Sequence, residues 1–551
     1  MVQNRTVQGK QKVKNVSGSV IDTDSEREEN TTDLVASSLP DAAQSPVPTK
    51  KAARYHRKWG GKTFHFRFTS FHFGRDLATR RFSLAEAAFL LMLAYITSKG
   101  LGVVRQSLFN AIFGAGPTAT AYYAAFNLPD TLFNLIAGGA LSSAFLPVFL
   151  SYEKEHGERE VWRLTSLVFN VLLVSFTIVL SVAEWCAPTL VNTILVPGLP
   201  PAERALTVTL TRIMLLHSLI LGLGTIATAV LNGKRQFLLP ALAIAIYDVG
   251  LIGGLLVTLV FPRVGIYGPT YGLLVSAVCQ VAVLLPGLLK QGGRYSWLWD
   301  LRYPGLREVL RLLGPNVLAV SIASTSIILD SYFASYLPDG ASIPALRNAA
   351  LLFTLPVTLI AQAVGQALLP QLAAQATYGR YVRMRQTTLN IVGGAVLIGI
   401  LAATGICVLG KPMIALFFQH GAFDAHAASL TLLALFGYAV GIPGLIASGL
   451  LVLAFYALKD ARTPLLITIV IVFVRLGLIF VLLKVIAGPS VLLALPLAAS
   501  LASTMEAILL GLLLFRQLRS KVATDRGMQR LQKRRIYLAM RQTEERKATP
   551  S

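Results

Sequence analysis

The sequence predicts an all-α polytopic membrane protein with about 12 transmembrane helices, arranged as two six-helix bundles. Of its 551 residues, 54% are hydrophobic and only 14% are charged. Apolar stretches long enough to cross a bilayer follow one another from about Ser83 to Phe515. Lys and Arg gather in every other connection between these stretches. This composition excludes a water-soluble enzyme.

The expected spans are joined by short connections, so neighbours in sequence run in opposite directions. In chain order they are 84–113, 119–150, 161–183, 207–232, 238–261, 267–289, 307–337, 344–375, 388–418, 426–456, 464–486 and 491–516. Each is long enough to cross the hydrocarbon core of a membrane as an α-helix.

Basic residues give the chain an orientation. One set of connections carries most of them: Lys154, Arg159, Arg163, Lys234, Arg235, Lys290, Arg294, Arg302, Arg307, Arg311, Arg380, Arg383, Arg385, Lys459 and Arg462. The other set carries Arg204, Arg263 and Lys484. Positive residues stay cytoplasmic, and an even number of spans returns the chain to its starting side. We therefore expect a multi-pass protein of the inner (cytoplasmic) membrane with both termini in the cytoplasm.

Two tails flank the spans. Residues 1–83 are predicted to be disordered at first and then basic and aromatic, either as an interfacial segment or as a solvated linker. Residues 517–551 predict a polybasic anchor. The net charge of +23 lies mostly in these tails and in the connections, where it would bind anionic membrane lipids. Nucleic acid is not expected as a partner.

Neither a metal nor a cofactor is expected. The tail histidines His56, His65 and His72 lack a companion cluster of Cys or carboxylate residues. The three cysteines fall in or beside apolar spans, which predicts packing roles. No P-loop motif is present, so ATP hydrolysis by this chain is not expected.

An internal repeat organises the spans. The segments Gly139–Phe149 and Gln362–Leu372 both read Ala-x-x-x-Ala-x-Leu-Pro and close the second and eighth spans. Lys234 and Pro240 after the fourth span correspond to Lys459 and Pro464 after the tenth. An offset of six spans predicts a parallel repeat, with a chance match of short apolar strings as the alternative.

This repeat sets the expected domains: an N-lobe at 84–289, a cytoplasmic linker at 290–306 and a C-lobe at 307–516. Pro129 and Pro356 occupy equivalent places in the two lobes. Proline inside a span removes a helical hydrogen bond, so each is a candidate hinge, with a static bend as the alternative.

Several strings resemble the MurJ/MviN family of lipid II flippases, within the multidrug/oligosaccharidyl-lipid/polysaccharide exporter superfamily. They are Ser98–Gln106, Phe113–Gly116, Ala125–Pro129, Gly139–Pro147, Leu416–Asp424 and Phe455–Pro464. The resemblance implies transfer of an undecaprenyl-diphosphate-linked glycan from the inner to the outer leaflet, by alternating access and without covalent chemistry.

The family's cavity is expected to bind the diphosphate with cationic side chains. Arg105 keeps one such arginine, and Lys99 stands where a second is expected. Lys99 and Arg105 are six residues apart, so both face inward only if Gly100 and Gly102 break the helix. The alternative is that one of them is an interfacial or structural charge, and Arg105 is then the better candidate for the diphosphate contact. The sequence departs from the family pattern at five further positions: Gln106, Ala121, Phe133, Leu351 and Thr354.

Arg347 lies one helical turn before Leu351 and is predicted to restore a cation in the cavity. The alternative places it at the start of its helix, reaching out to the membrane interface. Asp330 falls where the family has a polar residue, which suggests a cavity or structural role. The remaining charges within spans are expected to be paired or interfacial: Asp130, Asp248, Arg475 and Glu506.

Three functions therefore compete. The first is a lipid II flippase that acts in peptidoglycan synthesis. The second is a non-transporting homologue that acts as a scaffold for envelope-assembly proteins. The third is an ion-coupled exporter of another lipid-linked glycan or of organic cations. A cationic cavity favours the first, a filled cavity the second and an acidic cavity the third.

Overall fold

The computed structural model describes residues 84–136, 139–293 and 295–548, and these form α-helices joined by short turns. The chain divides into two units, Met1–His72 and Phe73–Ser551. The predictions for tail residues 1–83, and those for Arg294, lie outside the described residues. The expected all-α membrane fold is confirmed in the part of the chain that is described.

Fourteen α-helices are described, and each expected span is matched by one of them or by two in succession. They are α1 Leu84–Phe113, α2 Pro117–Ile136, α3 Gly139–His156, α4 Glu158–Leu190, α5 Pro201–Gly233, α6 Leu238–Val260, α7 Tyr267–Lys290, α8 Pro304–Ala334, α9 Ser342–Thr377, α10 Tyr381–Phe417, α11 Ala425–Ala439, α12 Ile442–Ala457, α13 Arg462–Val485 and α14 Ala494–Ala548. Short helical turns follow α4, α6 and α13 at Val191–Leu195, Pro262–Val264 and Gly488–Leu493.

Eight membrane-spanning segments in the described residues are long and apolar enough to cross a bilayer. A ninth is the pair α11 and α12, which is bent by 46° where one span at 426–456 was expected. Pro443 explains the break, because proline fits the first turn of a new helix and cannot continue an old one. The expected spans 84–113, 119–150 and 307–337 are helical but are not among these nine.

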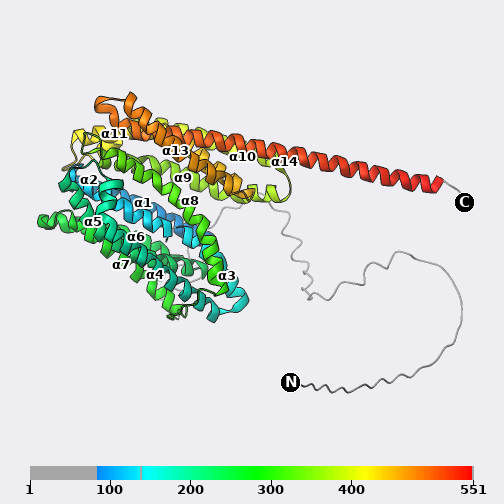
Figure 1. The fold of residues 1–551 in the computed structure, drawn as a ribbon, viewed down its shortest axis with the longest axis horizontal. Helices are drawn as coiled ribbons and strands as arrows, with labels where there is room; N and C mark the ends of the chain where they lie inside the picture. The colour runs from blue at the N-terminus through cyan, green and yellow to red at the C-terminus, as the bar shows by residue number, and fades with distance from the viewer. Residues whose placement is uncertain (1–83, 137–138, 294, 549–551) are drawn as a thin grey trace, which may run out of the picture. The chain divides into compact units, whose positions relative to one another are not determined.

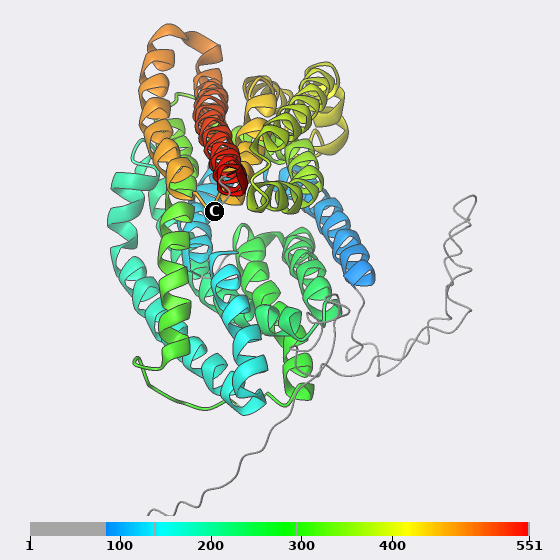
Figure 2. The same cartoon turned by 90° about the vertical axis from the view of Figure 1, so that its right-hand side faces the viewer.

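The helices gather in two groups (Figures 1 and 2). Helices α3 to α7 pack with α1 and α2, whereas α9 to α14 pack with one another. Helix α8 packs against α2, α3 and α4 from the first group and against α13 from the second. The proposed lobe boundary at 290–306 stays a prediction, with α8 as the helix that contacts both groups.

Two turns show how closely the groups repeat each other. Arg235 lies two residues after the end of α5 and Lys459 two residues after the end of α12, and they adopt left-handed φ values of 59° and 60°. In both turns the next N–H reaches back five residues, at 2.8 Å for Gln236 and 3.0 Å for Asp460. This bonding pattern defines the Schellman motif, and it is unusual to find it twice without glycine.

The matching turns support a parallel repeat and correct its register. Pro240 follows Arg235 by five residues, and Pro464 follows Lys459 by the same interval. Arg235 is thus the residue equivalent to Lys459, and the expected equivalence of Lys234 was wrong by one position. The sequence pattern was misleading here because both residues of the first turn are basic.

Helix α1 corrects another expectation. Gly100 and Gly102 do not break it, since it runs without interruption from Leu84 to Phe113. A glycine within a helix costs about 1 kcal/mol relative to alanine. Opening the helix within a bilayer would leave backbone groups without partners at a higher cost. Pro129 and Pro356 likewise lie inside continuous helices, and their role as hinges stays a prediction.

The turn after Lys459 is stabilised by Asp460. One carboxylate oxygen accepts the backbone N–H groups of Arg462 and Thr463, both at 3.1 Å, and the other accepts the Thr463 hydroxyl at 2.7 Å. Burial alone raises the pKa of Asp460, but these hydrogen bonds outweigh it and hold the pKa below its ordinary value. The Phe455–Pro464 string therefore builds the start of α13.

We expect Asp460→Ala to lower the free energy of unfolding by about 1 kcal/mol, as for loss of a helix cap, and Asp460→Asn to cost less. A depressed carboxyl pKa stabilises the fold above the unfolded pKa of about 3.9 and stops doing so as pH falls through the folded value. The difference between wild type and Asp460→Ala should thus be full at pH 7 and shrink below about pH 4. Thermal unfolding of the purified protein across this range checks it, and a difference that grows on acidification would contradict it.

Candidate functional site

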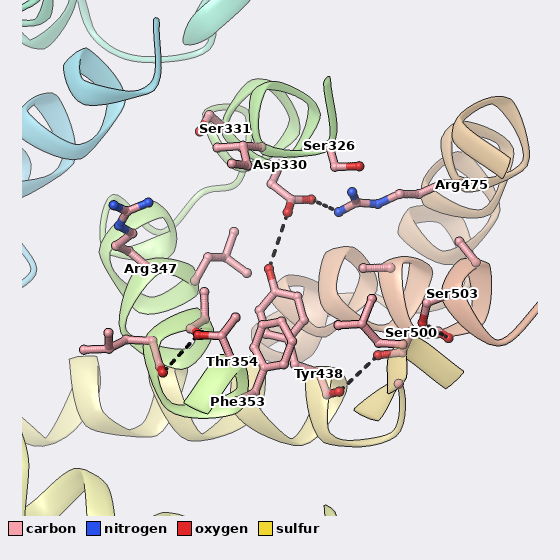
Figure 3. Close-up of a pocket in the computed structure, with 18 of the residues that line it drawn as sticks. Ser326, Asp330, Ser331, Arg347, Phe353, Thr354, Tyr438, Arg475, Ser500 and Ser503 are labelled. Atoms are coloured by element: carbon pink, nitrogen blue, oxygen red, sulfur yellow. Dashed lines mark hydrogen bonds and ion pairs between the residues drawn. The ribbon is translucent and has the colours of Figure 1, made fainter. Parts of the chain in front are cut away.

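A cavity of about 710 Å³ lies where α1 and α2 face α8, α9, α13 and α14. This volume is typical of ligand-binding sites. The charged residues in its wall are Arg105, Asp330, Arg347, Arg475 and Glu506. Three guanidinium groups thus face two carboxylates. Figure 3 shows the part of the wall that α8, α9, α11, α13 and α14 provide.

Arg105 is held at the cavity by α6. Its guanidinium lies 3.3 Å from a carboxylate oxygen of Asp248, and Ser98 donates a 2.6 Å hydrogen bond to the other oxygen. Ser98 and Arg105 are seven residues apart on α1, so they share a face of that helix. Asp248 is almost fully buried, whereas Arg105 keeps 28% of its side chain exposed. The pair therefore positions Arg105 and leaves part of it accessible.

Arg347 lines the cavity from the second turn of α9. Its guanidinium carbon lies 5.6 Å from the centre of the Phe126 ring, a cation–π contact. Among the described residues no carboxylate lies within ion-pair distance of it. Leu351 and Thr354 continue the same wall, so the cation stands one turn from the position where the family is expected to carry one. Of the two placements considered for Arg347, the cavity position agrees with the structure.

Opposite Arg347, the wall contains an ion pair between α8 and α13 (Figure 3). Arg475 donates to one oxygen of Asp330, and the Tyr438 hydroxyl donates to the other at 3.4 Å. Arg475 is 6% exposed and stands in the middle of a span. The expected pairing of this residue is found, but its place in the cavity was missed. An arginine at membrane depth was the signal that could have indicated it.

Beside the cavity, four polar side chains join α1 and α2 to α9. Gln106 donates to Asn348 at 2.7 Å and also to Tyr123 and Asn110, and Asn110 donates to Asn348 at 3.1 Å. Gln106, Asn110 and Asn348 are buried. The sequence presented Gln106 as a lost acidic residue, whereas the structure gives it a neutral bridging role between the two groups of helices.

Near these side chains, backbone contacts join turns from both groups of helices. We call this end of the helices the closed end. It comprises the turns at residues 114–116, 335–341 and 418–424. The Ala422 N–H donates to the carbonyl of Ala111 at 2.8 Å. Gly114 and Gly421 sit at this contact with φ values of +61° and +58°. A Cβ on Gly421 would overlap the backbone oxygen of Ala111, so the two turns meet only because both lack side chains there.

Other expected site residues lie elsewhere. Lys99 is exposed on α1 and outside the cavity wall, because the helix is continuous and turns it away from Arg105. Phe133 packs against Phe176 and Leu180 in a separate apolar cluster. Ala121 is fully buried. The expectation that Lys99 faces the cavity is therefore corrected, and Arg105 and Arg347 remain of the three cations proposed.

Comparison with known proteins decides the family. A family model described as "Lipid II flippase MurJ" matches residues 109–541. The chain belongs to the MurJ family. A lipid II flippase MurJ of Burkholderia cenocepacia is 32% identical over 383 residues, which are 68% of this chain and 73% of that protein. A probable lipid II flippase MurJ of Rhizobium tropici is 28% identical over 431 residues, 77% of this chain and 79% of that protein.

Solved structures show the same fold. One titled "Lipid II flippase MurJ, inward closed conformation" matches with a TM-score of 0.66 and 22% identity, over 77% of this chain and 86% of that one. An inward-facing multidrug resistance MATE family transporter of the MOP superfamily matches with a TM-score of 0.66 and 15% identity, over 80% and 99%. The resemblance to the MurJ family stated from the sequence is confirmed, and the chain is a multi-pass membrane protein of a transporter fold.

Proposed function

We propose that this MurJ-family protein carries lipid II, the lipid-linked peptidoglycan precursor, from the inner to the outer leaflet of the cytoplasmic membrane. The observation that supports it most is the open cavity between the two groups of helices, with Arg105 and Arg347 in its wall. A diphosphate leaving water needs charge-assisted hydrogen bonds, and guanidinium groups supply them in pairs. The protein acts as a transporter and not as an enzyme.

The cations have separate roles. Arg347 has no ion-pair partner among the described residues, so its guanidinium is free to bind the diphosphate. Arg105 is positioned by Asp248 and contributes the exposed part of its side chain. The undecaprenyl chain stays in the bilayer while the polar head crosses in the cavity. Exchange between two states, each closed on one side, moves the head without opening a continuous pore.

The closed end is the outer side in this proposal. Its turns at 114–116, 335–341 and 418–424 belong to the connections poor in Lys and Arg. By the positive-inside rule, the opposite connections and both termini are cytoplasmic. The described state is then the one that receives substrate from the inner leaflet. The basic tails bind anionic lipids at that same surface.

The structure disfavours the competing functions. A scaffold has no need of a cavity of about 710 Å³ lined by charged groups. An exporter of organic cations would need acidic residues in the wall that outnumber the cations, but the wall carries three arginines against Asp330 and Glu506, and Asp330 is paired with Arg475. Envelope-assembly proteins remain partners to be sought, because no described surface favours one.

Growth of cells depleted of their own lipid II flippase tests the proposal. Cells that express this protein should grow and keep their shape, whereas cells with an empty vector should lyse. Membrane abundance is measured alongside. Lysis despite wild-type protein at the abundance of a known flippase would contradict transport of lipid II and favour another lipid-linked glycan.

A further inference from the structure

We infer that Arg475 is a third anion-binding residue of the cavity, besides Arg105 and Arg347, and that Asp330 occupies it until an acidic group of the substrate replaces the carboxylate. This inference rests on the proposed function and deepens it. The ligand is a phosphate or carboxylate group of a lipid-linked glycan. It would bind on the α13 side of the cavity, across from Arg347 (Figure 3).

The bonding of Arg475 carries the inference. Its Nη2 atom donates to Asp330, while its Nε–H group is buried without a partner among the described atoms. A buried donor that makes no hydrogen bond is costly, and such groups are rare in the absence of a use. The side chain is 7% exposed and forms part of the cavity wall. An incoming anion could therefore bind a donor that the resting ion pair leaves unused.

Asp330 is suited to release Arg475. Its side chain is 19% exposed, more than that of its partner, and its second oxygen already accepts from Tyr438. The carboxylate keeps a hydrogen bond from Tyr438 when the guanidinium turns to another anion. Until then it cancels a charge that would be expensive to bury alone. The ion pair thus neutralises Arg475 while the cavity is empty, and it separates when a charged ligand binds.

The position of Arg475 also answers a question that the sequence raised. The chain carries Phe133 and Leu351 where its family is expected to carry arginines, which left the cavity short of cations. Arg347 supplies one from α9, and Arg475 supplies another from α13. The cavity therefore keeps three guanidinium groups, distributed over a different set of helices.

Binding to the full-length protein in lipid nanodiscs tests the role of Arg475. The probes are undecaprenyl diphosphate and lipid II, and the variants are Arg475→Gln, Asp330→Asn and the double variant with both changes. Arg383→Gln, on the exposed first turn of α10, is the matched control. We expect Arg475→Gln to weaken binding about tenfold and Asp330→Asn to tighten it, because the competing carboxylate is gone.

The double variant separates binding from folding. It removes both charges together, so its thermal unfolding should return close to that of the wild type, yet its binding should stay about tenfold weaker. Loss of affinity for both probes assigns the diphosphate to Arg475, and loss for lipid II alone assigns a carboxylate of its peptide. Wild-type affinity in the double variant would overturn the inference and leave Arg475 as the partner of Asp330 only.

This result is independent of the growth test. If the wild type supports growth but the double variant binds normally, only the inference fails. If the wild type neither supports growth nor binds either probe, the proposed function fails and the inference fails with it.

Discussion

Replacing Arg347 with alanine is expected to reduce lipid II transport by about tenfold to a hundredfold, so that the variant no longer sustains growth. A hydrogen bond to a charged group is worth about 1.5–3 kcal/mol, and each 1.4 kcal/mol is a factor of ten. We expect this large effect for Arg347 because its guanidinium has no carboxylate partner among the described residues and contacts the Phe126 ring through a cation–π interaction.

Arg347→Lys refines this prediction. The ammonium keeps the charge but loses the planar pair of donors, so transport should lie between that of Arg347→Ala and the wild type. Arg383→Ala removes an exposed arginine of α10 that is not part of the cavity wall, and it should leave transport unchanged. Growth rescue at matched membrane abundance provides the measurement. Full activity of Arg347→Ala would exclude it from substrate binding.

The second large effect is expected at the closed end, for Gly421→Ala. The added Cβ would overlap the backbone oxygen of Ala111, which cannot move aside as a flexible side chain could. The outer side would then stay open, and a transporter that cannot close one side cannot alternate between its two states. We therefore expect normal abundance but loss of growth rescue.

Gly488→Ala is the matched control for Gly421→Ala. Gly488 has φ +75°, and no atom lies within 4 Å of the position that a Cβ would take there. Alanine at Gly488 therefore suffers the same left-handed strain without a clash. That strain costs about 1–2 kcal/mol. Equal activity of the two variants would show that backbone strain, and not closure of the turns, sets the outcome.

A labelled cysteine reports the same closure directly. Ala345 is fully buried in the first turn of α9, near the closed end. In a chain without its three native cysteines, Ala345→Cys should resist a membrane-impermeant thiol reagent added from outside. Adding Gly421→Ala should expose it, whereas adding Gly488→Ala should leave it protected.

The sequence was sufficient for the helices and for two of the cavity cations. The apolar lengths located the helical segments, and α1 was expected at its observed bounds of 84–113. Arg347 was found because its spacing from Leu351 puts both on one helix face. The helices could be predicted because each depends on its own apolar length, whereas Arg105 and the position of Leu351 came from the family resemblance and only the step from Leu351 to Arg347 used the helical period.

Relations between helices were harder to predict. A helix breaks at proline or glycine only where the backbone groups that the break frees find other partners in the bilayer. This condition decides both the bend before Pro443 and the continuity of α1 through Gly100 and Gly102. The sequence predicted an ion pair for Arg475, and the structure contains one. Whether that pair lines a cavity depends on how α8, α11 and α13 pack together, which the sequence does not indicate. In helices that are apolar on every face, periodicity does not indicate which face meets which neighbour.

The most direct test of the proposed function measures lipid II at the outer face of living cells. Cells depleted of their own flippase and expressing this protein are treated with an external, membrane-impermeant agent that cleaves lipid II. Transport by this protein predicts that cleavage returns to the level of undepleted cells and falls again with Arg347→Ala. Lipid II that stays protected while the wild-type protein is abundant in the membrane would contradict it.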